Sequence, residues 1–162
     1  MQSPKAGVGR RVLIAPRLGC WDNGGICAGP QPEKLSNGNW LYVYNHDSHN
    51  ELNSPSGRCS AGWSILDKDD PTRVVARGSE PLVAGCNCTN NIPGQGDACL
   101  GKDTGRCGEP WDVQGQTPEV TFVDGLRPMG SDEFVITYGA SDQAVGATRF
   151  KIHLPATSAS AV

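Results

Sequence analysis

GWSILDKDDPTRVVARGSEPL, residues 62–82, is the stretch of sequence that decides the fold. Residues 63–66 are a short apolar run, and residues 73–77 are a second run rich in β-branched valine, so both are predicted strands. The aspartates between them and Pro71 favour a polar turn, because proline fixes φ and aspartate accepts hydrogen bonds from nearby main-chain N–H groups. The segment is therefore predicted to be a β-hairpin.

The flanking sequence contains further short strands separated by turns. Apolar or alternating runs predict strands at residues 40–44, 120–123, 134–138 and 148–154. Glycine, proline and polar residues predict loops at residues 20–35 and 45–50 and turns at residues 124–125 and 130–132. The chain is predicted to be all-β.

A weak internal repeat links two of these strands. The strand at residues 40–44 leads to a loop that contains Asp47, and Gly62 begins the next strand. In the same way, the strand at residues 134–138 leads to a loop that contains Asp142, and Gly146 begins the next strand. Recurring hairpins of one design are typical of radially stacked sheets, the blades of a propeller. Equivalent loops emerge at the same end of such a stack, so Asp47 and Asp142 are predicted to lie around one opening.

Composition limits the partners of the chain. Its 162 residues are 37% hydrophobic, which permits a modest core, and its 21 glycines and 12 prolines favour turns over helices. The formal net charge is −3 and there is no basic run, so no nucleic-acid partner is predicted. No apolar stretch approaches the roughly 20 residues of a membrane helix, and residues 1–10 lack the apolar region of a signal peptide.

Seven cysteines bear on the cellular compartment. Four of them lie within residues 84–115, a glycine- and asparagine-rich segment with little hydrophobic periodicity: Cys86, Cys88, Cys99 and Cys107. Their spacing departs from the usual Cys-x-x-Cys of zinc sites, so disulfides are favoured, although free thiols stay open. Together with a glycosylation sequon at Asn87, this density favours an extracellular or secretory location.

Several motifs resemble glycoside hydrolase family 130. Residues 62–82 are similar to the family signature Gly-Trp-Ala-Leu-Leu-Asp, Asp-Pro-Thr-Lys-Val, Arg-Ser-x-Glu-Pro-Leu. Four further blocks follow the order of the family: Trp-Asp-Asn at 21–23, AGPQPEK at 28–34, PEVTF at 118–122 and YGASDQAVG at 138–146. The resemblance covers most of the chain except the cysteine-rich segment.

This resemblance implies an architecture. Members of the family are β-mannoside phosphorylases and related hydrolases built on a five-bladed β-propeller, and the blocks above match its C-terminal half. Residues 1–155 are therefore expected to form two to three blades, with residues 84–115 as an irregular insertion and residues 156–162 as a disordered tail. A partial propeller should also leave an open blade edge.

The resemblance also implies a division of the active site. The general acid of the family is an aspartate in the N-terminal half, so no catalytic residue is assigned to this chain, which alone is expected to be inactive. Four residues are predicted to bind substrate: Lys34, Asn45, His46 and Asp142. Lys34 would hold an anion, Asn45 takes the place of a family histidine with His46 next to it, and Asp142 would contact the sugar.

The implied partners are a β-mannoside oligosaccharide and the missing N-terminal propeller half. No metal or organic cofactor is expected, and inorganic phosphate would be a co-substrate if the reaction is phosphorolysis. Two alternatives stay open. One is a non-catalytic carbohydrate-binding propeller, and the other is a disulfide-rich interaction module whose working surface is residues 86–107.

Overall fold

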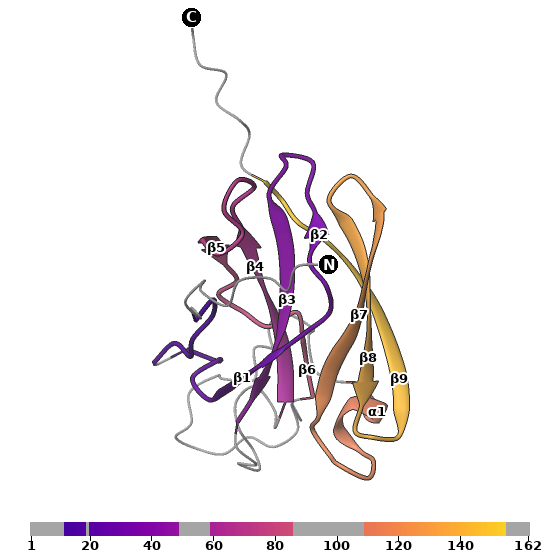
Figure 1. Cartoon of the computed structure of the whole chain (residues 1–162). Helices are drawn as coiled ribbons and strands as arrows, with labels where there is room; N and C mark the ends of the chain where they lie inside the picture. Colours follow the sequence, from indigo (N-terminus) through magenta and orange to yellow (C-terminus); the bar gives the residue numbers. More distant parts are fainter. Residues whose placement is uncertain (1–11, 19, 49–58, 86–108, 155–162) are drawn as a thin grey trace, which may run out of the picture.

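The computed structural model describes residues 12–18, 20–48, 59–85 and 109–154. In this part of the chain β-strands form two sheets, with one short helix beside the second (Figure 1). The first sheet contains β1 (Gly25–Ala28), β2 (Glu33–Lys34), β3 (Trp40–Asp47), β4 (Cys59–Leu66), β5 (Val74–Arg77) and β6 (Val83–Ala84). The second contains β7 (Thr121–Gly130), β8 (Glu133–Ala140) and β9 (Ala144–Lys151), preceded by α1 (Pro110–Val113). The all-β prediction is confirmed.

The first sheet is four strand positions wide. Both β1 and β2 pair with one edge of β3, and both β5 and β6 pair with the far edge of β4. Each outer position is thus one strand interrupted by a proline-containing segment, at residues 29–32 and 78–82. Proline has no N–H to give to a ladder, which explains the interruptions.

The predicted hairpin at residues 62–82 is confirmed as β4 and β5. Its turn is held by the side chain of Asp67, whose Oδ1 accepts hydrogen bonds from the N–H groups of Asp69 (2.9 Å) and Asp70 (3.0 Å). In the same way, Oδ1 of Asp70 accepts a hydrogen bond from the main-chain N–H of Thr72 at 3.1 Å. These aspartates therefore shape the turn, as the sequence predicted.

Strands occur in segments that were predicted to be loops or turns. The loop expected at residues 20–35 contains β1 and β2, and β3 continues through Asn45 and His46, which were expected in a polar loop. The turn expected at residues 124–125 is a β-bulge inside β7, where the ladder register shifts between Val123 and Gly125. Polar residues remain in a strand when the fold gives their side chains hydrogen-bond partners, which local patterns do not reveal.

The core lies between the two sheets. Alternate residues of β3 (Leu41, Val43) face alternate residues of β8 (Phe134, Ile136), and each of the four is at most 1% exposed. A fully buried side chain of this kind contributes about 1.5–3 kcal/mol to the free energy of folding. The alternation predicted for residues 148–154 is seen in β9, which packs Phe150 on this core.

The internal repeat is also seen in the structure. Tyr44 pairs with Gly62 across β3 and β4, and Tyr138 pairs with Gly146 across β8 and β9. Asp47 and Asp142 lie at the same end of the sheets, because Cys59, opposite Asp47, bridges to Val120, which accepts the N–H of Ser141 at 2.7 Å. The two aspartates therefore share one end of the sheets, whereas the opening that they were predicted to surround stays a prediction. The cysteine-rich residues 86–107 and the predicted tail 156–162 lie outside the described residues.

Candidate functional site

A buried aspartate is the centre of the most highly charged interior region that the structure describes. Asp22 is 0% exposed, and its Oδ2 lies 2.9 Å from Arg17 and 2.7 Å from Arg77. The hydroxyl of Tyr44 donates to the same oxygen at 2.8 Å. Two guanidinium groups and a phenol therefore compensate the desolvation of one carboxylate.

Aromatic rings hold this group in place. Trp21 stacks on Tyr44 with ring centroids 6.0 Å apart, and the guanidinium of Arg77 lies 4.7 Å from the centre of the same tyrosine ring. Gly62 permits this packing, because a Cβ at that position would overlap Trp21 and would lie 3.1 Å from the Tyr44 hydroxyl. Arg77 also donates to that hydroxyl at 2.9 Å.

The electrostatics of Asp22 favour a charged carboxylate. Burial acts to raise the pKa of Asp22, but the hydrogen bonds from Arg17 and Tyr44 and the charge of Arg77 outweigh it, so the pKa lies below its usual range. Burial raises the pKa of Tyr44 to about 12. Neither group is suited to transfer a proton near neutral pH, and the cluster acts as a structural anchor.

Asn45 and His46 adjoin this cluster and are both buried. The Asn45 side chain donates to the carbonyls of Ala28 (3.2 Å) and Val123 (3.1 Å) and accepts from the N–H of Val123 (2.8 Å). His46 accepts from the N–H of Gly24 through Nε2 at 3.1 Å, and its ring meets Trp21 edge-on. Both side chains are thus bound to the protein itself and join neighbouring segments.

The structure separates Lys34 from this pair. Lys34 pairs with Trp40 at the beginning of β3, whereas His46 is next to the end of β3. From Trp40 to His46 the strand rises by about 20 Å, at roughly 3.3 Å per residue. Lys34 is exposed, and its ammonium lies 5.5 Å from the centre of the Trp40 ring, a cation–π contact. Its predicted role in holding an anion stays a prediction.

Asp142 lies in the turn between β8 and β9, at the end of the sheets that also contains His46. It is exposed, has a positive φ of 51°, and accepts a hydrogen bond from the Thr117 hydroxyl. Of the four predicted residues, the structure therefore gathers Asn45, His46 and Asp142 at one end and places Lys34 at the other. Only Asp142 among the three presents its side chain to solvent.

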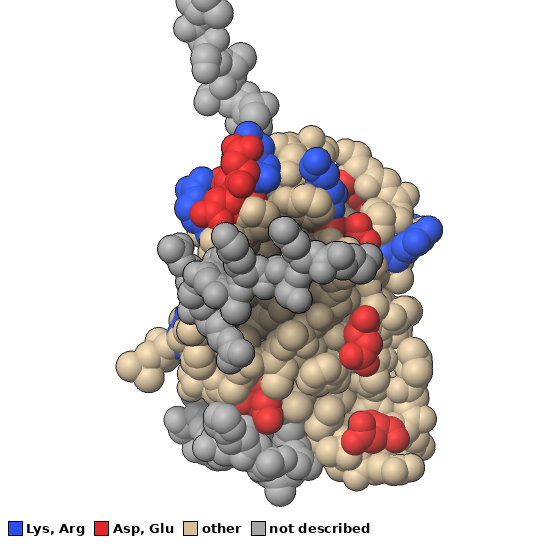
Figure 2. Space-filling model, viewed as in Figure 1, with Lys and Arg blue, Asp and Glu red and all other residues tan. Residues whose placement is uncertain are grey.

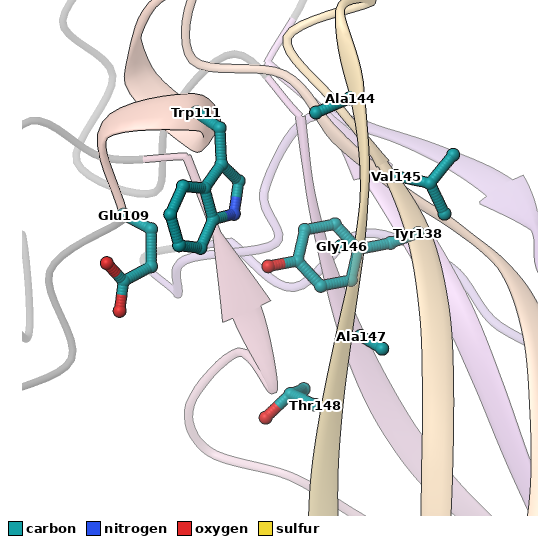
Figure 3. A pocket seen from close by; sticks show the side chains of 8 residues that line it. All are labelled: Glu109, Trp111, Tyr138, Ala144, Val145, Gly146, Ala147 and Thr148. Carbon is teal, nitrogen blue, oxygen red and sulfur yellow. The ribbon is translucent and has the colours of Figure 1, made fainter.

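A pocket of about 410 Å³ lies between α1 and the second sheet (Figure 3). Its walls are the side chains of Glu109, Trp111 and Tyr138 and the five consecutive residues 144–148 of β9. Sequence reasoning did not single out this pocket. The available signal was the dipeptide Trp-Asp, which occurs at residues 21–22 and again at residues 111–112.

Charged residues form no single-sign patch on the face drawn in Figure 2. There, acidic and basic side chains of the described residues gather together at the end that contains the β4–β5 turn, where Lys68 lies 2.6 Å from Asp69 and Arg73 pairs with Asp67. Within the described ranges, no three His, Cys, Asp or Glu residues are arranged to hold a metal ion. No helix in the same ranges is long and apolar enough to cross a membrane.

Comparisons with known proteins point to one group of enzymes. No protein-family model matches the chain. A β-1,2-mannobiose phosphorylase of Thermoanaerobacter sp. (strain X514) is 25% identical over 136 residues, which cover 82% of this chain and 34% of that protein. A 1,2-β-oligomannan phosphorylase of the same organism is 24% identical over 136 residues, covering 84% and 36%.

Solved structures show the same fold. The β-1,2-mannobiose phosphorylase of Listeria innocua, in complex with β-1,2-mannobiose, superposes with a TM-score of 0.62 at 23% identity, over 86% of this chain and 31% of that one. A glycoside hydrolase of family 130 that targets β-1,2-mannosidic linkages in Candida mannan superposes with a TM-score of 0.60 at 23% identity. The superposition covers 90% of this chain and 35% of that one. The chain spans about a third of the length of the relatives it matches. Over that third, the chain is similar in sequence to two β-1,2-mannoside phosphorylases and in fold to members of glycoside hydrolase family 130, the family that its sequence motifs resemble.

Proposed function

We propose that this chain forms two blades of a β-propeller that acts on β-mannosides. The observation that supports this most strongly is the agreement of sequence and fold, since 136 residues align with a β-1,2-mannobiose phosphorylase and the two sheets superpose on such an enzyme with a TM-score of 0.62. The first sheet has the four-strand width of a propeller blade, and the second is three strands wide.

The proposed reaction is cleavage of a β-1,2-mannosidic bond by phosphate or water. Such cleavage needs an acid that protonates the leaving oxygen while the nucleophile attacks the opposite face of the sugar. Asp22 is ill suited to be that acid, because two arginines hold its pKa below the usual range. We place the general acid outside this chain, in the part of the relatives' length that it does not cover.

Asp142 is the residue proposed to contact the sugar. Its exposed carboxylate is fixed by Thr117 at the end of the sheets, and a carboxylate can accept hydrogen bonds from two neighbouring hydroxyls. Asn45 and His46 are proposed to position the strands around this end, because their own hydrogen bonds are made to the protein. Inorganic phosphate remains the proposed co-substrate.

Titration with β-1,2-mannobiose tests the proposed contact. Asp142→Ala is expected to weaken binding at least about tenfold, the effect of losing a charge-assisted hydrogen bond. Asp124→Ala is the matched control, because Asp124 is an exposed aspartate on β7 outside this turn, and it should leave the affinity unchanged. Equal affinities of natural chain and Asp142→Ala would remove Asp142 from the site.

An activity assay tests the placement of the acid. The chain is incubated with β-1,2-mannobiose, with and without inorganic phosphate, and products are identified by chromatography. We expect neither mannose 1-phosphate nor free mannose. Either product would contradict the proposal that the general acid lies outside this chain.

A further inference from the structure

The two sheets repeat one arrangement of four residues. In each, a Trp-Asp pair precedes the sheet, the aspartate is buried (Asp22 0%, Asp112 3% exposed), and a tyrosine of the second strand bonds to it. Tyr44 reaches Asp22 at 2.8 Å, and Tyr138 reaches Asp112 at 3.5 Å. Each tyrosine also pairs across the ladder with a glycine of the third strand.

The two arrangements differ at the fourth strand position. In the first sheet β5 occupies it, and Arg77 of β5, which pairs with Ser64, forms the ion pair with Asp22 and covers the ring of Tyr44. In the second sheet no described strand pairs with the outer edge of β9, the edge strand in Figure 1. Val145 on β9 is 81% exposed there.

Among the described residues no cation pairs with Asp112, whereas Arg17 and Arg77 both pair with Asp22. Oδ2 of Asp112 accepts the N–H of Glu109 at 2.9 Å and the Tyr138 hydroxyl, whereas its buried Oδ1 has no hydrogen-bond partner. A buried, unpaired carboxylate oxygen is costly, and a guanidinium group is the donor best suited to it. In the first sheet Arg17 donates to both carboxylate oxygens of Asp22, and Arg77 of the fourth strand position adds a second guanidinium group 2.7 Å from Oδ2.

The pocket is lined by the strand β9, with whose outer edge no described strand pairs. Its walls include residues 144–148 of β9 and the ring of Tyr138, and Figure 3 shows the phenol directed towards α1, which contains Asp112. Thr148 is the counterpart of Ser64, because both lie two residues beyond the glycine that faces the tyrosine. A strand paired with β9 would therefore place the counterpart of Arg77 opposite Thr148.

We propose that the edge of β9 binds an extended strand from another polypeptide segment, with an arginine opposite Thr148 that pairs with Asp112 and stacks on Tyr138. The main-chain groups of the strand would complete the ladder, and the arginine would supply specificity. This chain does not cover about two thirds of the relatives' length, and we place the source of that strand in the uncovered part.

A peptide that copies β5 tests the proposal in trans. The probe is residues 72–79, Thr-Arg-Val-Val-Ala-Arg-Gly-Ser, and the control is the same peptide with Arg77→Gln. Hydrogen exchange of the chain with the first peptide should show new protection of the β9 amides, residues 144–151. The Gln peptide should bind about tenfold more weakly, the loss of one charge-assisted pair.

Asp112→Asn provides the matching change on the protein, and it should abolish the difference between the two peptides. The comparison of the two peptides uses the natural chain, so it does not depend on whether the Asp112→Asn variant folds. Equal affinities of the two peptides, or protection located elsewhere than β9, would overturn the proposal. It would also fail if the β9 amides were already protected in the chain alone, or if the chain self-associated through β9, since another occupant would then fill the edge.

Discussion

Asn45 on β3 forms hydrogen bonds with both main-chain groups of Val123 on β7, accepting from its N–H at 2.8 Å and donating to its carbonyl at 3.1 Å. A single amide side chain thus extends the hydrogen bonding of one sheet into the other. The position that sequence motifs suggested for substrate binding joins the two sheets.

Asn45→Ala should destabilise the chain by about 3 kcal/mol, because it leaves a buried N–H and a buried carbonyl of Val123 without their partner. Urea unfolding measures the loss. Asn37→Ala is the control, since Asn37 is exposed and its Oδ1 accepts a local bond from Asn39 at 3.0 Å. A similar loss in both variants would contradict the role assigned to Asn45.

The strands with a clear hydrophobic period were predictable from sequence, and those with polar interiors were not. The β4–β5 hairpin and β8 follow from apolar runs and turn residues. The end of β3 was expected to be a loop because Asn45 and His46 are polar. Both are buried in the strand by partners that lie on distant segments, Val123 and Gly24. Local propensity contains no information about such partners.

The candidate site was predictable only in part, for a related reason. Asp142 was singled out through its motif, and the structure places it exposed in a turn, while its contact with a sugar stays a prediction. The buried ion pairs of Asp22 join residues as far apart as 22 and 77, so only the fold reveals them. The second Trp-Asp pair was visible in the sequence, but its meaning depends on the edge of β9, with which no described strand pairs.

Gly62→Ala and Gly146→Ala should each destabilise the chain by about 1–3 kcal/mol, the usual cost of overpacking. A methyl group at Gly62 would overlap Trp21, and one at Gly146 would lie 2.6 Å from the Tyr138 hydroxyl. Gly130→Ala is the control, because the nearest atom to its added methyl group is a Glu133 carboxylate oxygen 3.9 Å away. In thermal unfolding, Gly130→Ala should therefore have a higher melting temperature than the other two variants. An equal loss of stability at all three sites would refute the packing argument.

Arg77→Lys should also destabilise the chain, although the charge is kept. The guanidinium pairs with Asp22 at 2.7 Å, bonds to the Tyr44 hydroxyl at 2.9 Å and covers the Tyr44 ring, and one ammonium group cannot make all three contacts. We expect a loss of about 1–2 kcal/mol in urea unfolding, from one charged hydrogen bond. Arg149→Lys is the control, because Arg149 is exposed and lies 3.7 Å from Glu133. Unchanged stability of Arg77→Lys would show that charge alone suffices.

Asp22 and Asp112 should respond to acid in opposite directions. The pKa of Asp22 is lowered, since Arg17, Tyr44 and Arg77 outweigh its burial, so the carboxylate stabilises the fold above its unfolded pKa of about 4 and this stability is lost as pH falls through the folded value. Burial raises the pKa of Asp112, so its contribution is complete below the unfolded pKa and is lost as pH rises through the folded value. At pH 7, Asp22→Asn should cost about 3–5 kcal/mol, because two arginines lose their partner.

Urea unfolding of both variants between neutral pH and about pH 3 measures these dependences. The advantage of the natural chain over Asp22→Asn should shrink as pH falls. Relative to Asp112→Asn, the natural chain should instead become more stable as its Asp112 takes up a proton. If the free energy of unfolding relative to the natural chain changed with pH in the same way for both variants, the two aspartates would have the same electrostatics. The arginines beside Asp22 would then not cause a difference between the two sites.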